Sequence, residues 1–169
     1  MNSRDLLLDG YGRIPDLVRA AVDGLDDARL ADRLDGATNS VAWLVWHLVR
    51  VQDDHVADVA GHEQVWTADG WARRFALPLE DTDTGYGHDS GQVSLVRAPA
   101  DLLLGYLDAV HARTTAYLRG LGDEDLDRVV DERYDPPVTL GVRLVSVLDD
   151  DLEHAGQAAL LRGVLLRRS

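Results

Sequence analysis

The chain contains no cysteine. A disulfide, a thiolate metal ligand and a protein thiol nucleophile are therefore all excluded. Any thiol chemistry at this protein must use a thiol that the substrate brings.

Lysine is also absent, so all 17 basic residues are arginine. This absence excludes Schiff-base mechanisms and lysine nucleophiles. Positive charge is scarce overall, because 30 acidic residues give a formal net charge of -13. Since the arginines are scattered and the net charge repels phosphate groups, we expect the protein to bind neither nucleic acid nor anionic membranes.

Long apolar runs are missing too. No run approaches the about 18 apolar residues that indicate a membrane-spanning helix. The residues Asn2-Ser3-Arg4-Asp5 lack the basic-then-apolar order of a signal peptide, so we expect a cytoplasmic protein. A length of 169 residues with 46% hydrophobic composition predicts that residues 1–169 form a single domain with a sizeable core.

What the sequence has in abundance is helical periodicity. Apolar residues recur at spacings of three and four in four long segments, which predicts an all-α four-helix bundle. The four segments are residues 4–24, 40–60, 99–120 and 139–167. Pro15 should kink the first helix or mark an early turn. Between the second and third helices we expect a short helix in residues 63–77 and a long loop, residues 76–98, that closes over a site.

The fourth helix carries a pair of polar residues with metal-binding potential. Asp150 and His154 are four residues apart and therefore share a helix face. His47, on the second helix, is the best candidate for a third ligand. Two histidines and one carboxylate hold a divalent ion and leave positions open for water or substrate, as catalytic centres require. The simpler alternatives are a surface ion pair for Asp150 and His154 and a buried structural role for His47. However, these residues lie among apolar positions, where burial of an unpaired carboxylate is costly.

Two further residues are candidates for catalytic roles. Asp54 follows His47 by seven residues on the same helix, where it could orient an imidazole or contact a substrate. His88 lies in a glycine-rich stretch of the long loop, where a histidine could act as an acid or base. The simpler reading of His88 is an exposed turn residue.

Two stretches of the sequence resemble a known family. Residues 39–48 read Asn-Ser-Val-Ala-Trp-Leu-Val-Trp-His-Leu, and residues 150–163 run from Asp-Asp-Leu-Glu-His-Ala-Gly-Gln to Leu-Leu-Arg-Gly. Together they resemble the DinB-like superfamily of metal-binding four-helix bundles and, within it, the mycothiol S-transferases of actinobacteria. The resemblance implies that His47, Asp150 and His154 hold a divalent metal, often zinc. Many relatives have histidine where this chain has Asp150, and a further histidine at Ser146, so the set here is harder than an all-nitrogen site.

The resemblance also implies an activity, which is conjugation of a low-molecular-weight thiol, mycothiol, to an electrophile. We expect the metal to lower the pKa of the substrate thiol. The expected cofactor-binding and pocket residues are Trp46, Arg50, Tyr86 and Arg143, with Asp54 and His88 beside them. Alternatives on the same scaffold are a metal-dependent hydrolase or isomerase, and a non-catalytic, stress-associated module whose metal braces two helices. Relatives are often dimers, so a homodimer is possible.

Overall fold

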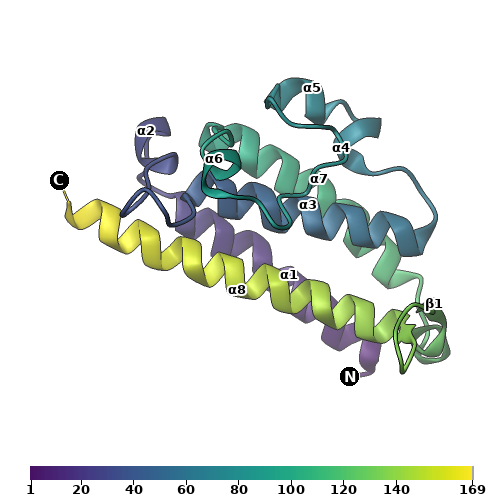
Figure 1. Cartoon of the computed structure of the whole chain (residues 1–169). Helices are drawn as coiled ribbons and strands as arrows, with labels where there is room; N and C mark the ends of the chain where they lie inside the picture. Colours follow the sequence, from purple (N-terminus) through teal and green to yellow (C-terminus); the bar gives the residue numbers. More distant parts are fainter. Residues whose placement is uncertain (169) are drawn as a thin grey trace.

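The computed structural model describes residues 1–168 and confirms the all-α four-helix bundle (Figure 1). Its long helices lie close to the predicted segments. They are α1 (Ser3–Val22), α3 (Val41–Ala60), α7 (Ala100–Arg119) and α8 (Leu140–Arg167). None of the helices described in residues 1–168 combines the length and the hydropathy of a membrane-spanning segment.

The four helices form a square in cross-section. α8 packs on α1 and α3, and α7 packs on the same two helices from the other side. Figure 1 shows that α1 and α8 run in one direction while α3 and α7 run in the other. α3 and α8, which were predicted to carry the metal ligands, are therefore antiparallel neighbours.

Local sequence sets where the two ligand-bearing helices begin and end. The Ser40 side chain accepts a hydrogen bond from the Trp43 N–H at 3.1 Å and caps α3, and Gly61 ends α3 in the left-handed conformation with φ of 70°. The Thr139 side chain accepts from the Val142 N–H and caps α8. Every residue from 41 to 50 is buried. Such all-round burial means that α3 is covered on the sides that α7 and α8 leave open.

Of the two outcomes expected at Pro15, the early turn is wrong. α1 continues through Pro15 from Ser3 to Val22, and Pro15 is buried. Its neighbours Tyr11, Ile14 and Val18 are buried as well, and their packing offsets the backbone hydrogen bond that proline cannot donate.

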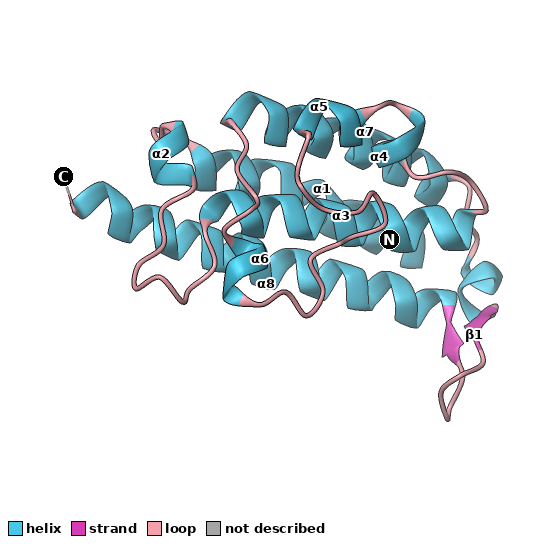
Figure 2. Ribbon diagram, turned by 45° about the horizontal axis from the view of Figure 1, so that its top comes forward, coloured by secondary structure: helices cyan, strands magenta, loops and turns pink. Residues whose placement is uncertain are grey.

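The cover over α3 comes from the crossover segment, residues 61–99. Because α3 and α7 run in the same direction, the chain must return along the bundle between them, and Figure 2 shows this segment crossing in front of α3. It holds three short helices where the sequence predicted one, partly because Gly70 adopts a φ of 73° and divides the first two. These are α4 (Val65–Ala68), α5 (Trp71–Phe75) and α6 (Ser90–Val93).

Smaller elements complete the fold at the two ends of the bundle. α2 (Asp27–Leu30) follows α1, and a 3-10 helix, η1 (Asp123–Asp127), follows α7. A two-stranded antiparallel hairpin, β1 (Val129–Asp131) and β2 (Val138–Thr139), then leads into α8. Strands this short cannot be predicted from helical periodicity. The hairpin is relevant to function because its loop reaches the site.

Candidate metal centre and two adjoining cavities

His47, Asp150 and His154 come together as predicted, and we call them the triad. Each offers a ligand atom, and these atoms lie within 4.8 Å of one another. The Asp150 Oδ1 and His154 Nε2 atoms are 3.7 Å apart on α8, and the ring centroids of His47 and His154 are 4.9 Å apart across the α3–α8 interface. Ligand atoms around a zinc ion sit about 3.4 Å apart, as follows from bond lengths of about 2.0–2.2 Å in a tetrahedron. A small inward rotation of the side chains would reach that spacing.

His47 is held in the protonation state that a metal ligand needs. Its Nδ1 faces the carbonyl oxygen of Thr84, which can only accept, so Nδ1 carries the proton and Nε2 keeps its lone pair. The Trp43 indole stacks on the imidazole with ring centroids 4.5 Å apart. Burial lowers the pKa of His47, although the Thr84 carbonyl and Asp150 act in the opposite direction. Burial, the largest of these effects on the pKa, favours the neutral imidazole, and the Thr84 hydrogen bond and the Trp43 ring fix its orientation.

The two α8 ligands carry polar atoms that the protein leaves unsatisfied. Asp150 Oδ2 and His154 Nδ1 are both buried, and neither has a hydrogen-bond partner among residues 1–168. Buried polar atoms in native proteins are nearly always paired. The unpaired carboxylate oxygen, two imidazoles and a spacing close to that of metal ligands fit a divalent cation. The mixed nitrogen and oxygen set is compatible with zinc and with harder ions.

A cavity of about 510 Å³, the triad cavity, opens beside these ligands. Asp54, Tyr86 and Arg143, all predicted from the sequence, line it together with His47 and Asp150. Sequence reasoning missed the others, which are Val51, His55, Thr84, Tyr134, Ser146 and Val147. Tyr134 comes from the hairpin loop and is 61% exposed, and Tyr86 comes from the crossover segment and is 92% exposed. Two loops distant in the sequence thus place aromatic rings along the same cavity.

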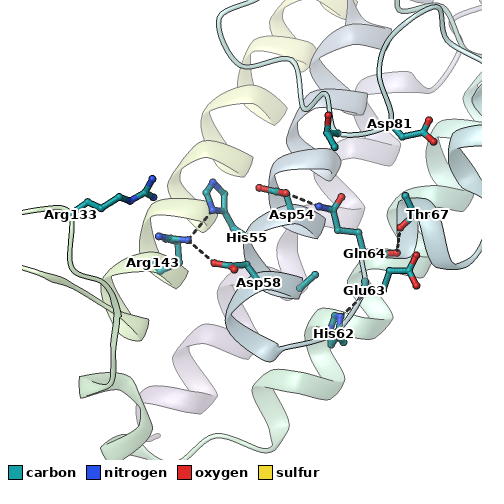
Figure 3. Close-up of a pocket in the computed structure, with 12 residues that line it drawn as sticks. Asp54, His55, Asp58, His62, Glu63, Gln64, Thr67, Asp81, Arg133 and Arg143 are labelled. Atoms are coloured by element: carbon teal, nitrogen blue, oxygen red, sulfur yellow. Dashed lines mark hydrogen bonds and ion pairs between the residues drawn. The ribbon is translucent and has the colours of Figure 1, made fainter.

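A second cavity of about 530 Å³, the polar cavity, adjoins the first. The two share three lining residues, Asp54, His55 and Arg143. Figure 3 shows the Arg143 side chain reaching from α8 toward His55 and Asp58 on α3. Its Nη1 lies 3.1 Å from His55 Nδ1 and 3.6 Å from Asp58 Oδ2, so this group forms part of the wall common to both cavities.

The comparisons with known proteins agree with this architecture. The family model of the DinB superfamily matches residues 11–158, which include the whole triad. The chain belongs to the DinB superfamily. Its fold also matches the crystal structure of a conserved protein from Enterococcus faecalis, with a TM-score of 0.92, 30% sequence identity and coverage of 98% of both chains. The search of curated proteins found no match.

In this DinB-superfamily chain, two predicted pocket residues lie away from both cavities. Arg50 is fully buried beneath the crossover segment. Its guanidinium donates to the carbonyl oxygens of Asp83 and Asp81 at 3.1 and 3.3 Å and to the Gln64 side chain at 2.7 Å. Trp46 is buried too, stacked against the His88 ring. The structure therefore places both residues in the packing that supports the crossover segment.

His88 is held by the protein at both ring nitrogens. Its Nδ1 accepts from Trp43 Nε1–H at 3.1 Å, so the proton lies on Nε2, which donates to the Asp83 carboxylate at 2.9 Å. This geometry anchors the loop onto α3. An acid or base role for His88 stays a prediction, and it would require one of these bonds to open.

Asp54 lines both cavities, and a catalytic role for it stays a prediction. Its Oδ1 accepts from Gln64 Nε2 at 2.6 Å, which fixes the carboxylate in the wall between the two cavities. Gln64 is in turn held by Arg50, so the buried network of the crossover segment orients a residue of the triad cavity.

Proposed function

We propose that this chain is a metal-dependent thiol S-transferase that joins a low-molecular-weight thiol, mycothiol, to an electrophile, with zinc as the metal. The observation that carries the proposal is the triad itself, which has unsatisfied polar atoms and borders a cavity open to solvent. Membership of a superfamily that includes metal-dependent enzymes supports it. The absence of cysteine fits a reaction in which the thiol comes from the substrate.

Three features of the site would have distinct tasks, namely the triad, the Thr84 carbonyl group and the Asp54 carboxylate. The chemistry that a divalent metal would supply here is Lewis acidity, which lowers the pKa of a thiol in contact with it. The Thr84 carbonyl keeps the His47 lone pair directed at the ligand position. The proton that leaves the thiol would pass through water in the triad cavity to Asp54, which lines that cavity about 10 Å along α3 from His47. The sulfur then forms a bond to the electrophilic carbon, and the leaving group departs with its electron pair.

Two other functions are possible on this scaffold. A hydrolase or isomerase would use the same ligands with water or with no thiol at all. A non-catalytic metal brace would have a closed coordination sphere, and the cavity beside the triad favours an open one. Dependence of turnover on a thiol separates the transferase from both alternatives.

The decisive experiment measures metal content by mass spectrometry on untagged protein purified without added metal. His154→Ala is prepared in parallel, with His111→Ala on α7, away from both cavities, as the matched control. We expect near-stoichiometric metal in the wild type and the control and little in His154→Ala, together with thiol-dependent transfer in the two metal-containing proteins. Equal and negligible metal in all three would refute the proposal.

A further inference from the structure

The polar cavity has no role in the function proposed above, yet it adjoins the triad cavity. Asp54 and His55 follow His47 by seven and eight residues on α3, and Asp58 follows by eleven. At a helical rise of about 1.5 Å per residue, the shared wall lies about 10–12 Å from the His47 position and Asp58 about 16 Å from it. A molecule whose reactive end contacts the triad would need a body of about this length to reach the polar cavity.

The walls of this cavity suit a hydrophilic ligand. Among the twelve described residues that line it, Ala57 is the one aliphatic side chain. The others offer hydroxyl, amide, imidazole, carboxylate and guanidinium groups, several of which are seen in Figure 3.

Charge narrows the class of ligand further. The lining holds four carboxylates, on Asp54, Asp58, Glu63 and Asp81, against two guanidinium groups, on Arg133 and Arg143. Both arginines are already paired with the Asp131 carboxylate, at 2.7 and 3.4 Å. Arg143 also pairs with Asp58. The surplus of negative charge therefore repels carboxylates and phosphates and favours hydroxyl groups or an amine.

We infer that the polar cavity binds the body of the thiol co-substrate, and that this body is rich in hydroxyl groups and carries no carboxylate. The inference rests on the proposed thiol transfer at the triad. It assigns selection between thiols to residues 10–16 Å away from the ligands, and it predicts discrimination against anionic thiols such as glutathione.

The test uses ligands without a thiol, so that binding is measured apart from turnover. The probes are glucosaminyl-inositol, which is mycothiol without its N-acetylcysteine, and S-methylglutathione, which has an anionic body. Calorimetric titration of the full-length protein should show binding of the first and at least about 10-fold weaker binding of the second. Equal affinities, or no binding of glucosaminyl-inositol, would overturn the inference.

Two variants locate the binding. Thr82 lines the polar cavity and not the triad cavity, so Thr82→Trp should fill the former and weaken glucosaminyl-inositol binding about 10-fold or more. Thr82→Val, which adds no bulk, is the matched control. Glu63→Gln removes one negative charge from the lining without adding bulk. It should therefore reduce the ratio of the affinity for glucosaminyl-inositol to that for S-methylglutathione. If Thr82→Trp and Thr82→Val bind the probe equally, the site is elsewhere.

A kinetic measurement separates this inference from the proposed function. The ratio of kcat/KM for mycothiol to kcat/KM for N-acetylcysteine should fall about 10-fold in Thr82→Trp. An unchanged ratio with active enzyme contradicts the inference alone. Absence of metal and of transfer with every thiol contradicts the proposed function, while the binding experiment still decides whether the cavity takes the hydroxyl-rich body.

Discussion

Two polar clusters draw residues from neighbouring turns of α3, Arg50 and Asp53 in the first and His47 in the second, and they differ in how their atoms are satisfied. In the first, Asp53 accepts hydrogen bonds from the Val65 and Trp66 N–H groups and from Tyr106, at 2.7–2.9 Å. Arg50 donates from every guanidinium nitrogen. In the second cluster, the triad, Asp150 Oδ2 and His154 Nδ1 have no partner within the described chain.

The comparison shows that burial alone does not identify a functional site. Arg50 is buried more completely than any triad residue, yet its donors all serve the backbone and side chains of the crossover segment and its neighbours. A saturated network stabilises one conformation. An unsaturated one beside a cavity has capacity left for a ligand, and this distinction makes the triad the candidate centre. The predictions below test it in order of decreasing effect.

The largest effect should come from the saturated cluster. Arg50→Met removes the donors to the Asp81 and Asp83 carbonyl oxygens and leaves Asp53 without a cation, so we expect the free energy of unfolding to fall by about 3–5 kcal/mol. Urea denaturation measures this change. Arg113→Met, at an exposed position on α7, should change it by less than about 0.5 kcal/mol. Similar changes in the free energy of unfolding for both variants would show that the saturated cluster does not stabilise the fold.

Gly85 is the point at which the backbone of the crossover segment approaches His47 of the triad. Its φ is 90°, and a Cβ added there would lie 2.8 Å from His47 Nδ1. Gly85→Ala should therefore destabilise the fold by about 1–3 kcal/mol and, by displacing the Thr84 carbonyl, weaken zinc binding about 10–100-fold. Gly87→Ala is the matched control, because Gly87 also has a positive φ but no atom within 4 Å of the added Cβ. Competition with a chromophoric chelator measures the zinc affinity of each variant. An equal loss of zinc affinity in Gly85→Ala and Gly87→Ala would show that backbone strain alone is responsible.

Asp151 is the neighbour of a triad ligand but faces the core, fully buried and with both carboxylate oxygens unpaired among residues 1–168. Burial, with a smaller contribution from Asp150, raises its pKa well above the ordinary value. The folded state thus favours the protonated acid while the unfolded chain ionises near pH 3.9. Stability is therefore present at low pH and is lost as pH rises from about 4 through the folded pKa.

Asp151→Asn should remove this loss and stabilise the protein by about 1–3 kcal/mol at pH 7, with a smaller gain at pH 4. Unfolding curves at the two pH values test the sign. Asp149→Asn, at an exposed position on the same helix, should show no such pH-dependent gain. A gain that shrinks as pH rises would contradict the assignment.

The smallest change in fold stability is expected at the triad. Asp150→Asn should alter the stability of the metal-free protein by less than about 1 kcal/mol, because its carboxylate has an unpaired buried oxygen. Saturating zinc should raise the melting temperature of the wild type, since a ligand at 100 times its Kd adds about 2.7 kcal/mol, and this rise should be lost in the variant. Thermal unfolding with and without zinc measures both. The same zinc-dependent rise in both proteins would exclude Asp150 as a ligand.

The sequence predicted the parts of this molecule that depend on local pattern. Helical periodicity located the long helices, and the four-residue spacing of Asp150 and His154 placed two polar groups on one face. Arg50 was predicted to line the pocket and His88 to act as an acid or base. Their partners Asp81 and Asp83 lie in a loop without periodicity, so no sequence pattern indicates these contacts. The polar cavity was missed because its walls come from α3, α8, the crossover segment and the hairpin, and their meeting is a property of tertiary structure.

The parallel course of α3 and α7 has a consequence for how such a protein can diversify. A connection between two helices that point the same way must travel back along the bundle, so a covering over α3 is imposed by the topology before any substrate is considered. The ligands sit on the rigid helices and the covering sits on the return path. Insertions and deletions in the return path can therefore reshape the cavities while the triad keeps its geometry, and one metal-binding frame can be adapted to many substrates.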